Sequence, residues 1–209
     1  MKDLIVLVAD KNAKFGIENL LSRIESLGIR KISYETYVHP RHDPGIIHEA
    51  AEFLRQFSRD CSYALVLLDH EGSGQENIPC DEVASKLKRD IELCGWQDRV
   101  EVIVFNPELE NWAWAESRHV AEAFGWNNYP DIKNWLKEHG VWEENALKPK
   151  KPKEALELSL KKSGIPRSSS IYQEIAQRVT LSNCQDQSFI KFKMILRGWF
   201  PPNQPQLEE

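Results

Sequence analysis

Acidic residues follow three apolar segments of this chain, and carboxylates in such positions can bind a divalent cation. These acids are Asp10, Asp69, Glu71, Glu108 and Glu110. Hard carboxylate oxygens suit Mg²⁺ or Mn²⁺, and these ions keep water ligands that a substrate phosphate can displace. On an extended chain Asp69 and Glu71 face the same side, with roughly 7 Å between their Cα atoms. We therefore expect both side chains to converge on one ion.

Each of these acids also has an ordinary structural interpretation, which stays open at this point. An Asp at the end of a strand commonly caps the following helix. Glu108 follows Pro107 in the first turn of a predicted helix, where negative charge is favoured by the helix dipole. Acidic groups behind three separate strands favour a shared metal site more than any one of them does alone.

The elements that must position these acids have the pattern of an α/β protein. Continuous apolar runs predict buried strands over residues 4–9, 63–68 and 100–105. Alternation over residues 31–38 predicts a half-exposed edge strand, and apolar residues at helical spacing predict helices over residues 12–27, 44–57 and 79–94. Buried Val/Ile/Leu strands separated by helices indicate a Rossmann-like parallel sheet covered on both faces. Ligands bind at the carboxyl ends of such strands, where the acids lie.

The second half of the chain has a helical pattern. Helices are predicted over residues 131–139, 153–162, 170–181 and 185–199. We expect residues 1–115 to form the α/β core, residues 116–200 a helical lobe packed on it, and the Pro/Gln/Glu-rich residues 201–209 a flexible tail. Trp112 and Trp114 are two apart on a predicted helix, so one should fill the core between sheet and helices while the other covers the lobe.

Basic residues gather locally although the formal net charge is -5, which excludes a polybasic nucleic-acid binder but not a local patch. The four lysines of residues 148–153 are Lys148, Lys150, Lys151 and Lys153. They can contact nucleic-acid phosphates, or they can be the solvated start of a helix. Arg41 and His42, in the loop of residues 39–42, are further candidates to meet a phosphate.

Several blocks of the sequence resemble the Toprim family. There a glutamate follows the first strand and an Asp-x-Asp motif follows a later one, positions matched here by Asp10 and by Asp69-His70-Glu71. Residues 107–112 (Pro-Glu-Leu-Glu-Asn-Trp) are similar to the Pro-x-x-Glu-x-Trp segment of the RloB-like branch of bacterial defence proteins. The blocks at 8–12, 39–40, 43–45, 69–74, 107–110, 148–153 and 199–201 resemble, across nearly the whole chain, small Toprim-like components of methylation-associated antiphage defence systems.

The resemblance implies a Mg²⁺-dependent nuclease that works with other defence proteins on DNA or RNA. Asp10, Asp69 and Glu71 would be its catalytic acids, with Asp69 and Glu71 holding the metal and Asp10 acting as a ligand or general base. Glu108 or Glu110 would complete a second metal position or orient a lysine. The sequence departs from the family in having Asp10 where a glutamate is expected and Glu71 in place of the second Asp, which changes the reach of both side chains.

Two alternatives differ in chemistry: a non-catalytic adaptor that keeps the fold, and a phosphohydrolase acting on a free nucleotide. The four cysteines form no C-x-x-C pair, which disfavours a structural zinc site. No stretch approaches 18 apolar residues, and the start of the chain has the pattern of a strand rather than a signal peptide. We therefore expect a cytoplasmic protein with free thiols and no membrane partner.

Overall fold

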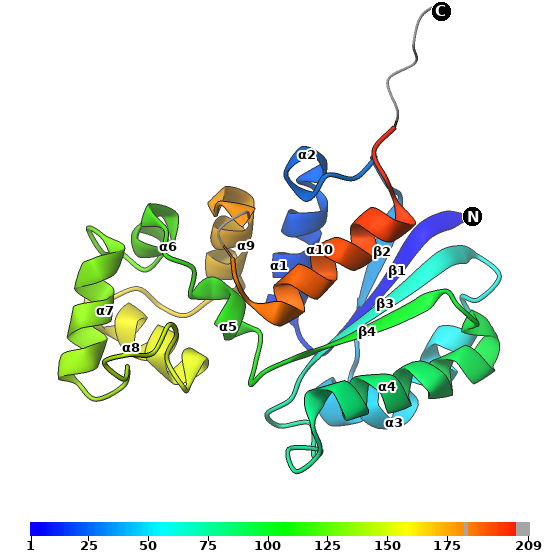
Figure 1. Ribbon diagram of the computed structural model, residues 1–209, viewed down its shortest axis with the longest axis horizontal. Helices are drawn as coiled ribbons and strands as arrows, with labels where there is room; N and C mark the ends of the chain where they lie inside the picture. The colour runs from blue at the N-terminus through cyan, green and yellow to red at the C-terminus, as the bar shows by residue number, and fades with distance from the viewer. Residues whose placement is uncertain (182–183, 204–209) are drawn as a thin grey trace, which may run out of the picture.

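A parallel sheet of four strands lies at the centre of the computed structural model, which describes residues 1–181 and 184–203 (Figure 1). The strands are β1 (Lys2–Val8), β2 (Tyr34–Val38), β3 (Cys61–Asp69) and β4 (Val100–Phe105). Their order is β2-β1-β3-β4, and every pairing is parallel. The predicted parallel α/β sheet is confirmed, and β2 is an edge strand as its alternating pattern predicted.

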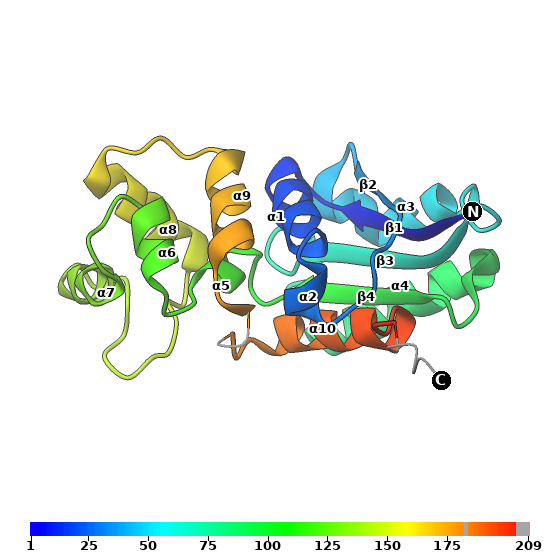
Figure 2. The same cartoon turned by 90° about the horizontal axis from the view of Figure 1, so that it is seen from above.

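Helices cover both faces of the sheet, as the continuous apolar strands required. Helices α1 (Lys11–Leu21), α2 (Ile24–Leu27) and α10 (Gln187–Trp199) cover one face, and α3 (His42–Arg55) and α4 (Cys80–Ile91) cover the other (Figures 1 and 2). A short π-helical segment, η1 (Glu92–Trp96), follows α4. Alternate residues of β1 enter the two buried clusters on either face. No helix in the described ranges has both the length and the apolar character needed to cross a bilayer.

The helix predicted over residues 12–27 is divided into α1 and α2. The Ser22 hydroxyl donates to the Asn19 carbonyl (2.7 Å), and Arg23 leaves helical geometry. This break lets the Arg23 guanidinium donate to the carbonyls of Ala176 and Val179 at 2.8 and 2.7 Å. A long-range contact therefore overrides a continuous helical pattern. Gly28, with φ of 71°, ends α2 as a left-handed cap.

The remaining helices are α5 (Glu110–Ala113), α6 (Arg118–Ala123), α7 (Tyr129–Glu138), α8 (Pro152–Ser163) and α9 (Ser169–Arg178). Helices α6, α7 and α8 lie beyond the carboxyl end of the sheet, with α5 and α9 between (Figure 2). Helix α10 instead runs along the sheet, where Lys191 Nζ donates to the Val102 carbonyl at 2.9 Å. The division at residue 115 stays a prediction, and residues 204–209 of the expected tail lie outside the described residues.

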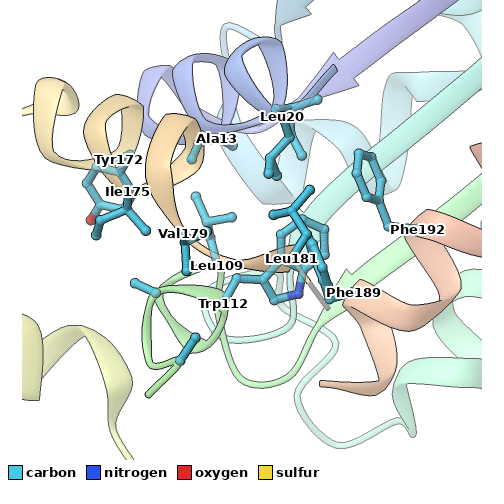
Figure 3. Close-up of a cluster of buried hydrophobic side chains, with 14 of the residues drawn as sticks. Ala13, Leu20, Leu109, Trp112, Tyr172, Ile175, Val179, Leu181, Phe189 and Phe192 are labelled. Atoms are coloured by element: carbon cyan, nitrogen blue, oxygen red, sulfur yellow. The ribbon is translucent and has the colours of Figure 1, made fainter. Parts of the chain in front are cut away.

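Trp112 and Trp114 separate as their spacing predicted. The Trp112 ring meets Phe189 edge-on with centroids 4.8 Å apart (Figure 3). It meets Phe105 edge-on at the same distance and so joins β4 to α10. The Trp114 ring points into the lobe instead, against Phe124 and Trp142 at 5.3 and 5.4 Å. One buried cluster therefore runs continuously from this face of the sheet into the lobe.

Candidate metal centre

Every strand of the sheet is followed by an acid, and all four strands end at the same edge. Asp10 follows β1, Asp69 ends β3, and Glu108 follows β4. The acid behind β2 is Asp43, in the first turn of α3, which was not among the predicted site residues. Its position shortly after the predicted edge strand is the sequence signal that could have indicated it.

These acids surround a cleft of about 500 Å³ between the sheet edge and α8. Seven acidic and two basic side chains line it. We call the group that follows β1, β2 and β3 the sheet side of the cleft: Asp10, His42, Asp43, Asp69 and Glu71. We call the acids after β4 and their partners from the helical segment the lobe side: Glu108, Glu110, Lys151, Lys153, Glu154, Glu157, Arg167 and Tyr172.

Three of the five predicted metal ligands come together. Asp69, Glu108 and Glu110 each offer a carboxylate oxygen, and these oxygens lie within 4.8 Å of one another. Each residue also keeps a second oxygen that accepts no hydrogen bond from the described residues. Three hard oxygen donors beside an open cleft fit Mg²⁺ or Mn²⁺, which bind through a few carboxylates and retain water.

Asp10 and Glu71 line the same cleft but lie outside this group. The Asp10 side chain accepts from the Ala13 N–H at 2.8 Å and so caps α1. Glu71 is exposed in the turn after β3 rather than on the extended chain that its spacing from Asp69 suggested. The chain bends there because the N–H groups of His70 and Glu71 both donate to the Pro107 carbonyl at 3.0 Å.

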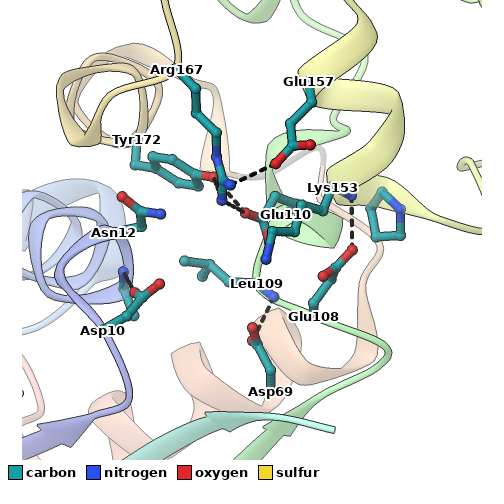
Figure 4. Close-up of polar contacts among 12 residues, drawn as sticks. Asp10, Asn12, Asp69, Glu108, Leu109, Glu110, Lys153, Glu157, Arg167 and Tyr172 are labelled. Carbon is teal, nitrogen blue, oxygen red and sulfur yellow. Dashed lines mark hydrogen bonds and ion pairs between the residues drawn. The ribbon is translucent and has the colours of Figure 1, made fainter. Parts of the chain in front are cut away.

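Asp69 is held in place by two backbone hydrogen bonds and has no basic partner among the described residues. Its carboxylate accepts from the Leu109 N–H at 2.8 Å (Figure 4). Its own N–H donates to Asp43 Oδ1 at 2.7 Å. Burial raises the pKa of Asp69 well above its usual range, and the charges of Asp43 and Glu110 raise it further. Burial raises the pKa of Asp43 as well. A divalent cation would relieve both effects.

Glu108 connects the sheet edge to the start of α8. Its Oε1 accepts from the Lys153 N–H at 2.9 Å (Figure 4). Glu108 lies before α5 rather than in the first turn of the following helix, so the helix terminus that it caps is that of α8. Burial raises the pKa of Glu108, although the Lys153 hydrogen bond opposes this shift.

Glu110 is buried and has a cationic partner. Its Oε1 accepts from Arg167 Nη2 at 2.9 Å and from the Tyr172 hydroxyl, and Arg167 also pairs with Glu157 at 2.6 Å (Figure 4). Burial, with the neighbouring charge of Glu110, raises the pKa of Tyr172, so this hydroxyl stays a donor. The sequence led us to expect a lysine beside Glu108 or Glu110, and the cation beside Glu110 is an arginine from the segment between α8 and α9.

Two of the predicted nucleic-acid contacts are engaged within the fold. Lys148 Nζ donates to the Asn111 carbonyl at 2.6 Å and to Asp186 at 3.2 Å, which ties the loop before α8 to the start of α10. Arg41 pairs with Glu49 and does not line the cleft. The contacts of Lys148 are not visible in the sequence, because they depend on how distant segments pack.

The other lysines of residues 148–153 remain open to a ligand. Lys150, Lys151 and Lys153 are exposed, and Lys151 and Lys153 line the cleft opposite the sheet-side acids. Lys151 lies 3.2 Å from Glu154 in an exposed pair of the kind that contributes little to stability. The start of α8 therefore supplies the two basic side chains of the cleft.

The chain was compared with models of protein families, with curated proteins and with solved structures. None of the three comparisons found a match for this chain. The resemblance to Toprim domains therefore depends on the sequence blocks alone, and the proposed function depends on the geometry of the cleft.

Proposed function

We propose that the protein is a Mg²⁺- or Mn²⁺-dependent nuclease that cleaves phosphodiester bonds of DNA or RNA as a component of a prokaryotic antiphage defence system. The observation that carries this proposal is the meeting of Asp69, Glu108 and Glu110 within 4.8 Å at the carboxyl edge of a parallel sheet. The Toprim-like and defence-protein sequence blocks support the choice of reaction and of cellular role.

Each residue of the cleft has a role in this proposal that follows from its position. Asp69, Glu108 and Glu110 would hold the cation, which polarises the scissile phosphate and stabilises negative charge on the leaving oxygen. Asp43 orients Asp69 by accepting its backbone N–H. Lys151 and Lys153 lie where they can contact phosphates that flank the scissile one.

The charge of the cleft makes metal dependence a physical requirement of this proposal. Seven acids against two lysines repel a polyanion, so nucleic acid can approach only when cations neutralise part of the site. The raised pKa values of Asp43, Asp69 and Glu108 have burial as their first cause, and mutual repulsion adds to it. A bound divalent cation would offset both the repulsion of the nucleic acid and the cost of the buried negative charge.

Cleavage assays with matched variants test the proposal. Purified protein is incubated with single- and double-stranded DNA, RNA and free nucleotides, with Mg²⁺, with Mn²⁺ or with EDTA. We expect metal-dependent cutting of a polynucleotide, and a loss of about 100-fold or more in Asp69→Asn and Glu108→Gln. Glu154→Gln, on the cleft but outside the ligand group, is the control. Cutting that survives both ligand variants contradicts the assigned site, and activity confined to free nucleotides indicates a phosphohydrolase.

A second candidate, a non-catalytic adaptor, is favoured by one observation: most of these acids already have a structural task. Asp10 caps α1, Glu108 caps α8, and Glu110 pairs with Arg167. An adaptor predicts no Mn²⁺ binding by calorimetry and normal defence in cells that carry Asp69→Asn. A nuclease predicts Mn²⁺ binding that this substitution weakens, together with loss of defence.

A further inference from the structure

The segment that joins β2 to α3 ends at His42, the first residue of α3, and places its imidazole on the sheet side of the cleft. His42 lines the cleft together with Asp10, Asp43 and Asp69. Arg41, its neighbour in sequence, pairs with Glu49 instead. Of the two residues of this loop that the sequence suggested for phosphate contact, only His42 lies at the site.

The hydrogen bonding of His42 fixes which ring nitrogen is available. Nδ1 lies 3.0 Å from the backbone carbonyl oxygen of Ala9. A carbonyl oxygen can only accept, so Nδ1 carries the hydrogen and Nε2 carries the lone pair of the neutral ring. The ring makes no other hydrogen bond within residues 1–181 and 184–203. Nε2 is therefore left for a ligand or for water.

His39 in the same loop shows the opposite arrangement. It is buried, its Nδ1 accepts from the Arg41 N–H at 3.2 Å, and its Nε2 faces Glu49 at 3.4 Å. Burial, with the charges of Arg41 and His42, lowers the pKa of His39, which keeps this ring neutral. Both nitrogens of His39 are used by the fold, whereas His42 uses only one.

The backbone holds His42 in a costly conformation. Its φ is 52°, and among the described residues only His42 and Asp98 are non-glycine residues with positive φ. A non-glycine residue in this region is disfavoured and persists where the surroundings hold it. Here the hydrogen bond to Ala9, the residue before Asp10, attaches the ring to the carboxyl end of β1.

We propose that Nε2 of His42 is the proton acceptor of the reaction in this cleft, an inference that rests on the proposed nuclease function. The water oxygen bonds to phosphorus while Nε2 takes the water proton. The bond from phosphorus to the leaving oxygen breaks, and that oxygen keeps the electron pair and takes a proton from solvent. His42 then returns its proton to solvent, so the ring is unchanged after each turnover.

The charged groups that line the cleft with His42 come from the segments after β1 and β4, from the end of β3 and the turn after it, from α3 and from the start of α8. They are Asp10, Asp43, Asp69, Glu71, Glu108, Lys151, Lys153, Glu154 and Glu157. Seven of these nine side chains are acidic.

The substitution His42→Asn tests the proposal without disturbing the loop, because asparagine tolerates positive φ. We expect the cleavage rate to fall about 100-fold and its pH dependence between about pH 5 and 8 to flatten. Mn²⁺ affinity should be unchanged. His48→Asn is the control, because His48 is exposed on the same helix and does not line the cleft. Nitrogen-15 NMR of the imidazoles should show His42 protonated at Nδ1.

The outcomes separate this inference from the proposed function. Wild-type protein that cuts nucleic acid, with His42→Asn equal to it in rate and pH profile, overturns the role of His42 and leaves the nuclease intact. A neutral His42 protonated at Nε2 overturns it too, since that nitrogen then has no lone pair to accept a proton. Wild-type protein that cuts nothing with either metal overturns both.

Discussion

The two sides of the cleft differ in whether a buried acid has a cationic partner. On the lobe side, Glu110 is buried against the Arg167 guanidinium and the Tyr172 hydroxyl. Glu108 receives only the backbone N–H of Lys153, and burial raises its pKa. On the sheet side, Asp43 and Asp69 are partly buried, and the described residues provide no basic partner for either. The pKa values of Asp43 and Asp69 are raised by burial, the second of them strongly.

This difference separates acids that stabilise the fold from acids that carry an electrostatic cost. A buried carboxylate with a guanidinium partner is compensated within the chain, and removing the partner exposes the cost. A buried carboxylate without a cation is compensated only by protonation or by a ligand. The sheet side therefore gains most from a bound divalent cation, and the lobe side supplies the attachment of the helical segment.

The largest effect is expected from Arg167→Ala, which removes the compensation of Glu110. Glu110 is only 4% exposed and Arg167 31%, so we expect the free energy of unfolding to fall by roughly 2–3 kcal/mol in urea titrations. Arg178→Ala is the control, because Arg178 pairs with Glu122 and Glu174 at the surface and should cost less than about 1 kcal/mol. Equal losses in the two variants would remove the distinction between compensated and surface pairs.

Asp69→Asn is expected to stabilise the metal-free protein at neutral pH, by less than Arg167→Ala destabilises it. Asparagine keeps the acceptor for Leu109 but removes the unpaired charge, so Tm should rise by about 2–4 °C, or roughly 1 kcal/mol. Asp10→Asn should leave Tm nearly unchanged, since asparagine is an equally good helix cap. Saturating Mg²⁺ should raise the Tm of the wild type and not that of Asp69→Asn. A destabilised Asp69→Asn variant would contradict the uncompensated sheet side.

The pH dependence of the stability gained by Asp69→Asn follows from the direction of the pKa shift of Asp69. Because the pKa of Asp69 is higher in the folded than in the unfolded state, folded protein binds the proton more tightly. The wild type loses stability as pH rises from about 3.9, the unfolded value, through the folded pKa. The advantage of Asp69→Asn should therefore be present at neutral pH and vanish toward pH 4. Thermal unfolding of both proteins across this range measures it.

The smallest effect concerns the positive charge of the lobe side. Replacing Lys151 and Lys153 with alanine should weaken nucleic-acid binding about threefold and reduce the slope of log affinity against log salt by about 1 to 2. Lys148→Ala should leave that slope unchanged and lower stability instead, because Lys148 bonds Asn111 and Asp186. Titrations at several salt concentrations distinguish the two. A reduced salt slope in Lys148→Ala would contradict this assignment and indicate that Lys148 contacts the nucleic acid.

The fold was largely predictable because three of its four strands, β1, β3 and β4, are mostly buried. The strand predicted over residues 100–105 has the bounds of β4, and the edge position of β2 followed from its alternating pattern. The division of the helix over residues 12–27 was not predictable, since it serves a contact of Arg23 with carbonyls more than 150 positions away in the chain. The placement of α10 along β4 likewise depends on packing rather than on helical spacing.

The candidate site was predictable in its acids and less so in their arrangement. Parallel strands bring their carboxyl ends to one edge, so acids behind three strands were expected to meet. Asp69 joins Glu108 and Glu110 rather than Asp10 and Glu71, because the chain bends after β3 toward Pro107. Asp43, which follows β2, was not among the predicted site residues, and its place beside His42 on the cleft depends on the tertiary structure.

The sequence by itself determined that a parallel sheet forms and that acids collect at its carboxyl edge, since burial on both faces and strand direction follow from local patterns. Tertiary structure alone decided which acids are compensated. Glu110 meets Arg167 from 57 positions away, and the Nδ1–H of His42 meets Ala9 from 33 positions away. Electrostatic compensation acts over a few ångströms in space, and the spacing of residues along a chain does not encode such distances.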